Sequence, residues 1–321
     1  MSVPLNILFW IIVVPGTVVL GLVACWIVRK VSALVQWRVG PPLCQPLYDI
    51  MKLMGKEILV PQDAQRTVFM AAPLVGLTGV LLLSIMLWRI TVTQTSFVGD
   101  IIVAIYLMVL PSLALILGSS ASASPHAAVG TSREMKLVMG YELSLVLAFI
   151  VVIIKMGRLV GAGLVEPGLQ LSLAEIAKQT PVFSISGMLA FLVALLCVQA
   201  KLGFVPFDMA EAETELGSGI LMEYSGALLA VWKVMQAVML VALPLFLVVV
   251  FLGGFGTTGW PLVWGIGKYV LIVVLLILIK NTNPRLRIDQ AMKFFWFYCG
   301  ITLVAAIILA TIGNYYGIGW L

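Results

Sequence analysis

The sequence is poor in charge, in histidine and in paired cysteines. Only 10% of its 321 residues are charged, whereas soluble proteins average about 25%, so an ordinary soluble protein is excluded. The one histidine, His126, cannot form a bis-histidine haem site within the chain. The cysteines are far apart and form no C-x-x-C pair, so they indicate no disulfide framework and no iron–sulfur or zinc ligand set; they are Cys25, Cys44, Cys197 and Cys299. We therefore expect no metal and no cofactor in this chain, and electron transfer only in partner proteins.

Long apolar stretches make up most of the chain. Hydrophobic residues account for 62% of it, and the mean hydropathy is +1.14. A bilayer core about 30 Å thick needs roughly 20 apolar residues per helix. Eight stretches qualify: Leu5–Val28, Val68–Val92, Ile101–Gly118, Leu137–Met156, Val182–Ala200, Ala227–Leu252, Leu262–Ile279 and Phe294–Ile312. The sequence predicts an all-α polytopic membrane protein with about eight transmembrane helices, forming one integral membrane domain over residues 1–321.

The basic residues predict its orientation. Most of the 19 Lys and Arg lie in the loops after the first, third, fifth and seventh stretches, and loops left in the cytoplasm are enriched in these residues. Lys201 is assigned to one of these loops. We expect a cell-membrane protein with both termini on the outer face. A net charge of +5 on so apolar a chain does not indicate a nucleic-acid partner, and the lipid bilayer is the expected environment.

The first inward loop contains an amphipathic pattern. Leu43, Leu47, Met51 and Met54 recur at helical spacing against polar residues such as Lys52. This pattern predicts a helix at the membrane surface. A surface anchor without further function explains the periodicity equally well.

Residues 201–226 hold an unusual concentration of acids, five of the 14 in the chain: Asp208, Glu211, Glu213, Glu215 and Glu223. If the chain is helical from Asp208, then Asp208, Glu211 and Glu215 share a face. Close carboxylates raise one another's pKa values and titrate as a unit, so such a cluster can hold and release protons. A solvated acidic loop is the alternative, but the apolar and small flanking residues favour a segment that enters the protein.

Glu142 and Lys233 are two of the charges that fall within apolar stretches. Glu142 lies near the start of the fourth stretch and Lys233 lies within the sixth. A charge inside a bilayer costs roughly 2.5 to 3.5 kcal/mol and indicates a functional site, so both are placed on an ion path. The alternatives are a carboxylate at headgroup depth for Glu142 and a structural cation that neutralises Glu223 for Lys233.

Four segments together resemble one family. They are PFDMAEAETELGSGILMEYSG from Pro206, GYE from Gly140, RVGP from Arg38 followed by QPLYDIMKL, and RLRIDQ from Arg285. They are similar to the subunit that joins the membrane arm of respiratory complex I to its peripheral arm, known as subunit 1 or as the H-type subunit, and the resemblance covers nearly the whole chain.

The resemblance implies a subunit with no catalytic residue and no redox centre, placed beneath a catalytic module at the entrance of a proton path. By position, the path would use Glu142, Asp208, Glu211, Glu213, Glu215 and Glu223. The surface facing the peripheral subunits would include Arg38, Asp49, Arg285, Arg287 and Asp289. By charge alone, the arginines of the last loop fit a docking surface and cytoplasmic retention equally well.

Two departures from the family pattern favour one branch. Pro42-Leu43-Cys44 leads directly into Gln45-Pro46-Leu47, which shortens a segment near the quinone chamber, and Val28 replaces a common acid. Both resemble the corresponding subunit of membrane-bound, energy-converting nickel–iron hydrogenases. The implied partners are hydrogenase-like large and small subunits, an iron–sulfur ferredoxin-like subunit and antiporter-like membrane subunits.

Three other functions are open at this point. The chain could belong to a related sulfur-reducing complex, form the quinone site of respiratory complex I, or act as a freestanding transporter, although no internal repeat typical of transporters is found. Carboxylates serve H⁺ and Na⁺ alike, so the sequence identifies neither the pumped ion nor the terminal electron acceptor.

Overall fold

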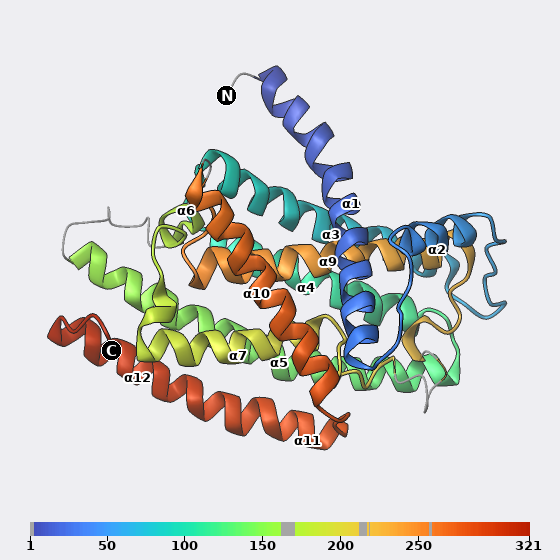
Figure 1. Ribbon diagram of the computed structural model, residues 1–321. Coiled ribbons are helices and arrows are strands. Elements are labelled where there is room, and N and C mark those ends of the chain that lie inside the picture. Colours follow the sequence, from blue (N-terminus) through green and yellow to red (C-terminus); the bar gives the residue numbers. More distant parts are fainter. Residues whose placement is uncertain (1–2, 162–170, 212–216, 218, 257–258) are drawn as a thin grey trace.

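The computed structural model describes residues 3–161, 171–211, 217, 219–256 and 259–321. Within these ranges the chain is all-α (Figure 1). Its longer elements are α1 (Val3–Val35), α2 (Gln45–Met54), α3 (Arg66–Thr93), α4 (Asp100–Ser120), α5 (Pro125–Gly161), α7 (Ile185–Lys201), α9 (Gly226–Phe251), α10 (Trp260–Thr282) and α12 (Gly300–Tyr316). Shorter ones are α6 (Leu173–Ile176), η2 (Pro181–Phe183), η3 (Gly219–Leu221), α11 (Ile288–Lys293) and the π-helical turn η4 (Phe294–Cys299).

The prediction of a polytopic helical membrane protein is confirmed. Each of the eight apolar stretches coincides with a helix, and seven helices in the described ranges are long and apolar enough to span a membrane. The eighth, α7, has 17 residues. The last span runs without a break through α11, η4 and α12, from Ile288 to Tyr316.

Helix α9 forms the centre of the bundle. Almost every residue from Met235 to Phe251 is buried, because α9 is apolar on all sides and a helix of that kind is stable in a core. It packs against α3, α1, α7 and α10, and in Figure 1 α10 crosses it. The N-terminal part of α1 extends beyond the bundle (Figure 1).

Small residues set the helix spacing, as is usual in membranes. A Cβ at Gly21 of α1 would lie 2.7 Å from the carbonyl oxygen of Ala237 in α9. A Cβ at Gly118 of α4 would lie 2.3 Å from the Tyr224 hydroxyl and 2.8 Å from the Cβ of Ala72. Only glycine allows such close approach at these two positions.

The amphipathic helix in the first loop is confirmed as α2. Met51 and Met54 are exposed on it, while Pro46 is buried. The Arg29 guanidinium at the end of α1 lies 2.8 Å from the Asp49 carboxylate, and its hydrogen bond holds the pKa of Asp49 below the usual range. This ion pair ties the surface helix to the first span.

The connection from α7 to α9 corrects one prediction. Asp208 and Glu211 lie in non-helical backbone, so the expectation of a helix from Asp208 is wrong for the described part of this segment. The chain turns instead, because Gln199 donates to the Val205 carbonyl at 2.7 Å and the Leu286 amide donates to the Pro206 carbonyl at 3.1 Å. Irregular backbone at this depth is tolerated because protein covers it.

The end of the same connection is fixed by Tyr224. Its ring stacks on Phe69 with centroids 4.1 Å apart, and its hydroxyl donates to the Phe69 carbonyl at 3.1 Å. Burial raises the pKa of this phenol well above its usual range, so Tyr224 remains a neutral donor.

Candidate functional site

A cavity of about 260 Å³ lies at the end of α7. Its wall is formed by the turn after Lys201 together with α1, α4, α5, α9 and α10. Several polar side chains line it: Cys25, Glu134, Lys201, Asp208, Glu211, Gln236 and Lys280. The cavity therefore collects three carboxylates and two ammonium groups from four separate parts of the chain.

Lys201 and Glu142 form a buried ion pair beside this cavity. The Lys201 side chain is 0% exposed and that of Glu142 is 15% exposed. Lys201 also donates to the Met108 carbonyl at 2.9 Å, whereas Glu142 Oε2 is buried and has no hydrogen-bond partner among the described residues. Taking an ion out of water costs several kcal/mol, and a close, well-bonded partner is needed to offset this cost. The burial of each of these two charges therefore depends on the presence of the other.

Tyr141 and Ser112 complete the surroundings of the pair. The hydroxyls of these two residues are 2.9 Å apart, and Lys201 Nζ lies 5.4 Å from the centre of the Tyr141 ring. The Tyr141 ring also meets Phe295 of the π-helical turn edge-on, at 6.4 Å. The ammonium group of Lys201 thus lies between the Glu142 carboxylate and the face of an aromatic ring.

Asp208 connects the cavity to the protein surface. Its carboxylate lies 2.8 Å from Arg285, and both residues border a second hollow of about 460 Å³ together with Arg133, Arg287 and Asp289. The two hollows share Asp208. A charged mouth at the end of the bundle thereby leads toward the interior carboxylates.

Glu211 is linked to Lys233 through one amide. Gln236 donates to Glu211 Oε1 at 2.7 Å and accepts from Lys233 Nζ at 3.2 Å. Lys233 is exposed on α9, and in the described ranges it forms no ion pair with Glu223, so the neutralising cation considered from sequence is not found. Lys233 does not line the cavity itself, and the hydrogen bond to Gln236 links it to the wall.

The remaining residues from the sequence prediction are placed as follows. Glu213 and Glu215 lie outside the described residues. Glu223 is half-buried, three residues before α9, and does not line the cavity. Four of the five residues expected at the peripheral surface are exposed: Arg38, Arg285, Arg287 and Asp289. Asp49 is half-buried against Arg29.

Sequence reasoning missed three residues of the cavity. Glu134 precedes the fourth apolar stretch, but α5 begins earlier, at Pro125, and places Glu134 two turns before Glu142. Lys201 was assigned to a cytoplasmic loop, and the structure corrects this because the residue is buried at the end of α7. Lys280 lies with its Nζ 4.4 Å from the centre of the Phe204 ring. Glu134 lies seven residues before Tyr141 and eight before Glu142, and residues at these spacings share one side of a helix. This spacing is the sequence signal that could have identified Glu134.

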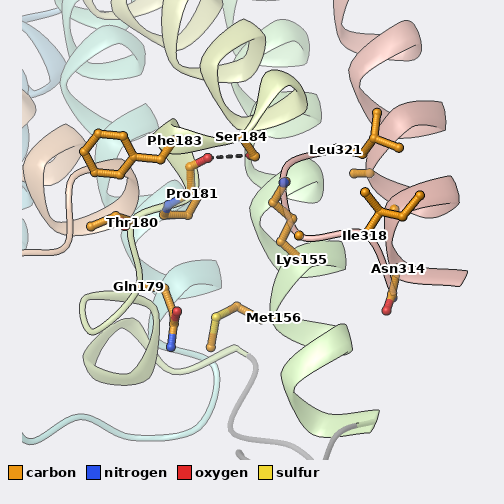
Figure 2. Close-up of a pocket in the computed structure, with 13 residues that line it drawn as sticks. Lys155, Met156, Gln179, Thr180, Pro181, Phe183, Ser184, Asn314, Ile318 and Leu321 are labelled. Carbon is orange, nitrogen blue, oxygen red and sulfur yellow. Dashed lines mark hydrogen bonds between the residues drawn. The ribbon is translucent and has the colours of Figure 1, made fainter. Parts of the chain in front are cut away.

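A further hollow lies at the opposite end of α5 and α7. It has a volume of about 380 Å³, and Lys155, Gln179, Ser184 and Asn314 supply polar groups to it (Figure 2). No Asp or Glu side chain is found among its described lining residues. We therefore take the acidic cavity near Lys201 as the candidate functional site.

Fold and cavity together define an all-α polytopic membrane protein with charged groups gathered in its interior. The chain belongs to the NADH dehydrogenase family, whose model matches residues 7–311. It is 33% identical to the second H-type subunit of NADH-quinone oxidoreductase from Syntrophobacter fumaroxidans, over 84% of each chain. It is 30% identical to the H-type subunit of the same enzyme from Dehalococcoides mccartyi, over 95% of this chain and 86% of the relative.

A solved structure shares the fold. It is a chain of the membrane-bound sulfane sulfur reductase, described as an archaeal respiratory membrane complex. The TM-score is 0.83, the match covers 95% of this chain and 99% of the other, and the identity is 24%. At this identity the likeness concerns the fold alone. Family membership confirms the resemblance to the connecting subunit of complex I, subunit 1 or the H-type subunit.

Proposed function

We propose that this protein is a membrane subunit without a redox centre that couples electron transfer in an attached peripheral module to translocation of H⁺ or Na⁺. One observation carries the proposal. The buried pair of Lys201 and Glu142 lies beside a cavity whose carboxylates reach the surface at Arg285. Buried ionisable groups in a membrane protein mark ion pathways by default, because they are costly to keep.

The coupling follows from electrostatics. Asp208, Arg285 and Arg287 line the outer hollow, where a docked partner would place its charges. A change of charge there acts strongly on the interior groups, because the surrounding dielectric constant is low. The cavity carboxylates respond by taking up or releasing a cation. Both termini are assigned to the outer face, which puts this mouth on the cytoplasmic side.

The partner is proposed to be a ferredoxin-linked hydrogenase-type or sulfur-reducing module. The short turn from Gly40 into α2 supports this branch, as does the fold shared with a chain of a sulfane sulfur reductase. On this view the neighbours are hydrogenase-like large and small subunits, an iron–sulfur subunit and antiporter-like membrane subunits.

The second candidate is the quinone-site subunit of a respiratory complex, which the names of the sequence relatives favour. The size of the cavity favours the first candidate. Its volume of about 260 Å³ is below the roughly 300–1,000 Å³ usual for pockets that hold organic ligands, while polar groups around a space of this size are suited to water and small cations.

Purification of the native complex through a tag on this chain separates these candidates. A nickel–iron-type large subunit with iron–sulfur proteins is the expected result. A flavin-containing NADH module would identify the quinone branch. A chain that purifies alone and transports ions alone would contradict the proposal.

Reconstitution of the purified complex tests the coupling. Reduction by the electron donor should drive ion uptake into vesicles, and Glu142→Gln should reduce this uptake more than electron transfer. Glu175→Gln is a matched control, because Glu175 pairs with Lys178 at the other end of the bundle, 2.6 Å away. Full uptake in Glu142→Gln would remove the buried pair from the mechanism.

A further inference from the structure

Glu134 is the one cavity carboxylate to which neither the sequence motifs nor the ion pairs above assign a role. It projects from α5 into the cavity that Lys201 also lines, and no hydrogen bond to its carboxylate is found within the described ranges. Glu211 and Lys201 are the charged groups that act on it. Among the described residues, Glu134 is therefore positioned by α5 without a fixed hydrogen-bond partner.

The positions of Glu134 and Glu142 on α5 relate them to one lysine. They are eight residues apart, which places both on the same side of the helix with their Cα atoms about 12 Å apart along its axis. Lys201 pairs with Glu142 and lines the cavity together with Glu134. A lysine side chain has a flexible four-carbon stem, so its ammonium group can turn from one carboxylate toward the other.

Charge balance in this group requires one more cation. Glu134 and Glu142 carry two negative charges when ionised, and Lys201 supplies one positive charge. Arg285 is already paired with Asp208 and is not available to the other acids. Glu211 accepts from the neutral amide of Gln236 and so adds a third negative charge, for which Lys280 supplies the second positive charge. Lys280 lies over the Phe204 ring on the α10 side of the cavity. A buried, uncompensated carboxylate is unfavourable, and one bound H⁺ or Na⁺ restores neutrality.

We infer that Glu134 is a further ion-handling carboxylate, which shares Lys201 with Glu142 so that the two acids bind one cation alternately. While the cation is on Glu134, Lys201 pairs with Glu142. When the cation leaves Glu134, its free carboxylate attracts Lys201, and Glu142 takes up a cation in turn. One cation moves from the cavity toward Glu142 for each turn of Lys201. The inference rests on the proposed function and adds a residue to it.

The test uses the whole membrane complex reconstituted in vesicles, with ions taken up per electron as the readout. Glu134→Gln is expected to lower this ratio by about tenfold or more, since positioned proton-transfer groups contribute 10²–10⁴-fold. Glu134→Asp keeps the charge and should retain most of the ratio. Glu175→Gln should leave it unchanged.

Each result has a defined meaning. A wild-type ratio in Glu134→Gln, together with a loss in Glu142→Gln, would overturn the role of Glu134 and leave the proposed function intact. No electron-driven uptake by the wild-type complex would overturn the proposed function itself. If Glu134→Gln does not assemble, wild-type complex is treated with dicyclohexylcarbodiimide, which reacts with protonated carboxyl groups in apolar surroundings. An adduct on Glu134 in the peptide mass spectrum supports the inference, and its absence contradicts it.

Discussion

Removal of one charge from the buried ion pair should be strongly destabilising. Glu142→Gln leaves the Lys201 ammonium, 0% exposed, with the Met108 carbonyl and a neutral amide as partners. Breaking a buried pair in this way costs about 3–5 kcal/mol, because the remaining charge is uncompensated. Replacement of both residues in Glu142→Gln/Lys201→Met removes the charge altogether, and the double variant should lie within about 1 kcal/mol of the wild type.

The measurement is the free energy of unfolding from detergent titration, arranged as a double-mutant cycle. Glu134 has to be considered, because it can act as a second partner for Lys201. The cycle is therefore repeated with Glu134→Gln as the background. There Lys201 has no second carboxylate to turn to, and Glu142→Gln should lower the free energy of unfolding by the full amount of about 3–5 kcal/mol. The control cycle uses Glu175 and Lys178, an exposed i,i+3 pair, for which about 0.3–0.5 kcal/mol is expected. A coupling energy equal to the control value in the Glu134→Gln background would refute the reasoning.

Three further predictions concern packing, pH and the charged mouth. Gly118→Ala places a Cβ 2.3 Å from the Tyr224 hydroxyl and should destabilise the bundle by about 1–3 kcal/mol, measured by the same titration; an unchanged value would show that Tyr224 moves freely. The hydrogen bond from Arg29 lowers the pKa of Asp49 in the folded protein. The pair therefore stabilises α2 fully at a pH above the unfolded-state pKa of about 3.9, and this stabilisation is lost as the pH falls through the lowered pKa of the folded state. Because water reaches both side chains of the pair, Asp49→Asn should remove no more than about 1 kcal/mol. Protection of the α2 amides from hydrogen exchange that is the same in the variant and the wild type, and the same at low and neutral pH, would contradict this. Arg285→Glu should reverse the charge opposite Asp208 and weaken retention of the peripheral module, seen as loss of co-purifying subunits; retention at the wild-type level would exclude this surface from docking.

The membrane architecture was predictable because it depends on segment length and apolarity. Each apolar stretch became a helix, and the periodic pattern around Leu47 and Met51 became α2. Both features are local, so a linear reading of the sequence is sufficient for them.

The composition of the cavity was only partly predictable. Glu142, Asp208 and Glu211 were selected because an acid in apolar surroundings is costly. Lys201 was not, because a lysine at a helix end is equally typical of a cytoplasmic loop, and only packing against Met108 and Glu142 shows that it is buried. The turn at Pro206 depends on Leu286, a residue far away in the sequence, so no local pattern predicts it.

The most direct test of the account is whether Glu142 changes its protonation state when the redox partner is reduced. The infrared difference spectrum between the oxidised and reduced complex measures this through the carboxyl C=O stretch. We expect a carboxyl band in the wild type that is absent from Glu142→Gln and unchanged in Glu175→Gln. Identical spectra for the wild type and Glu142→Gln would contradict it.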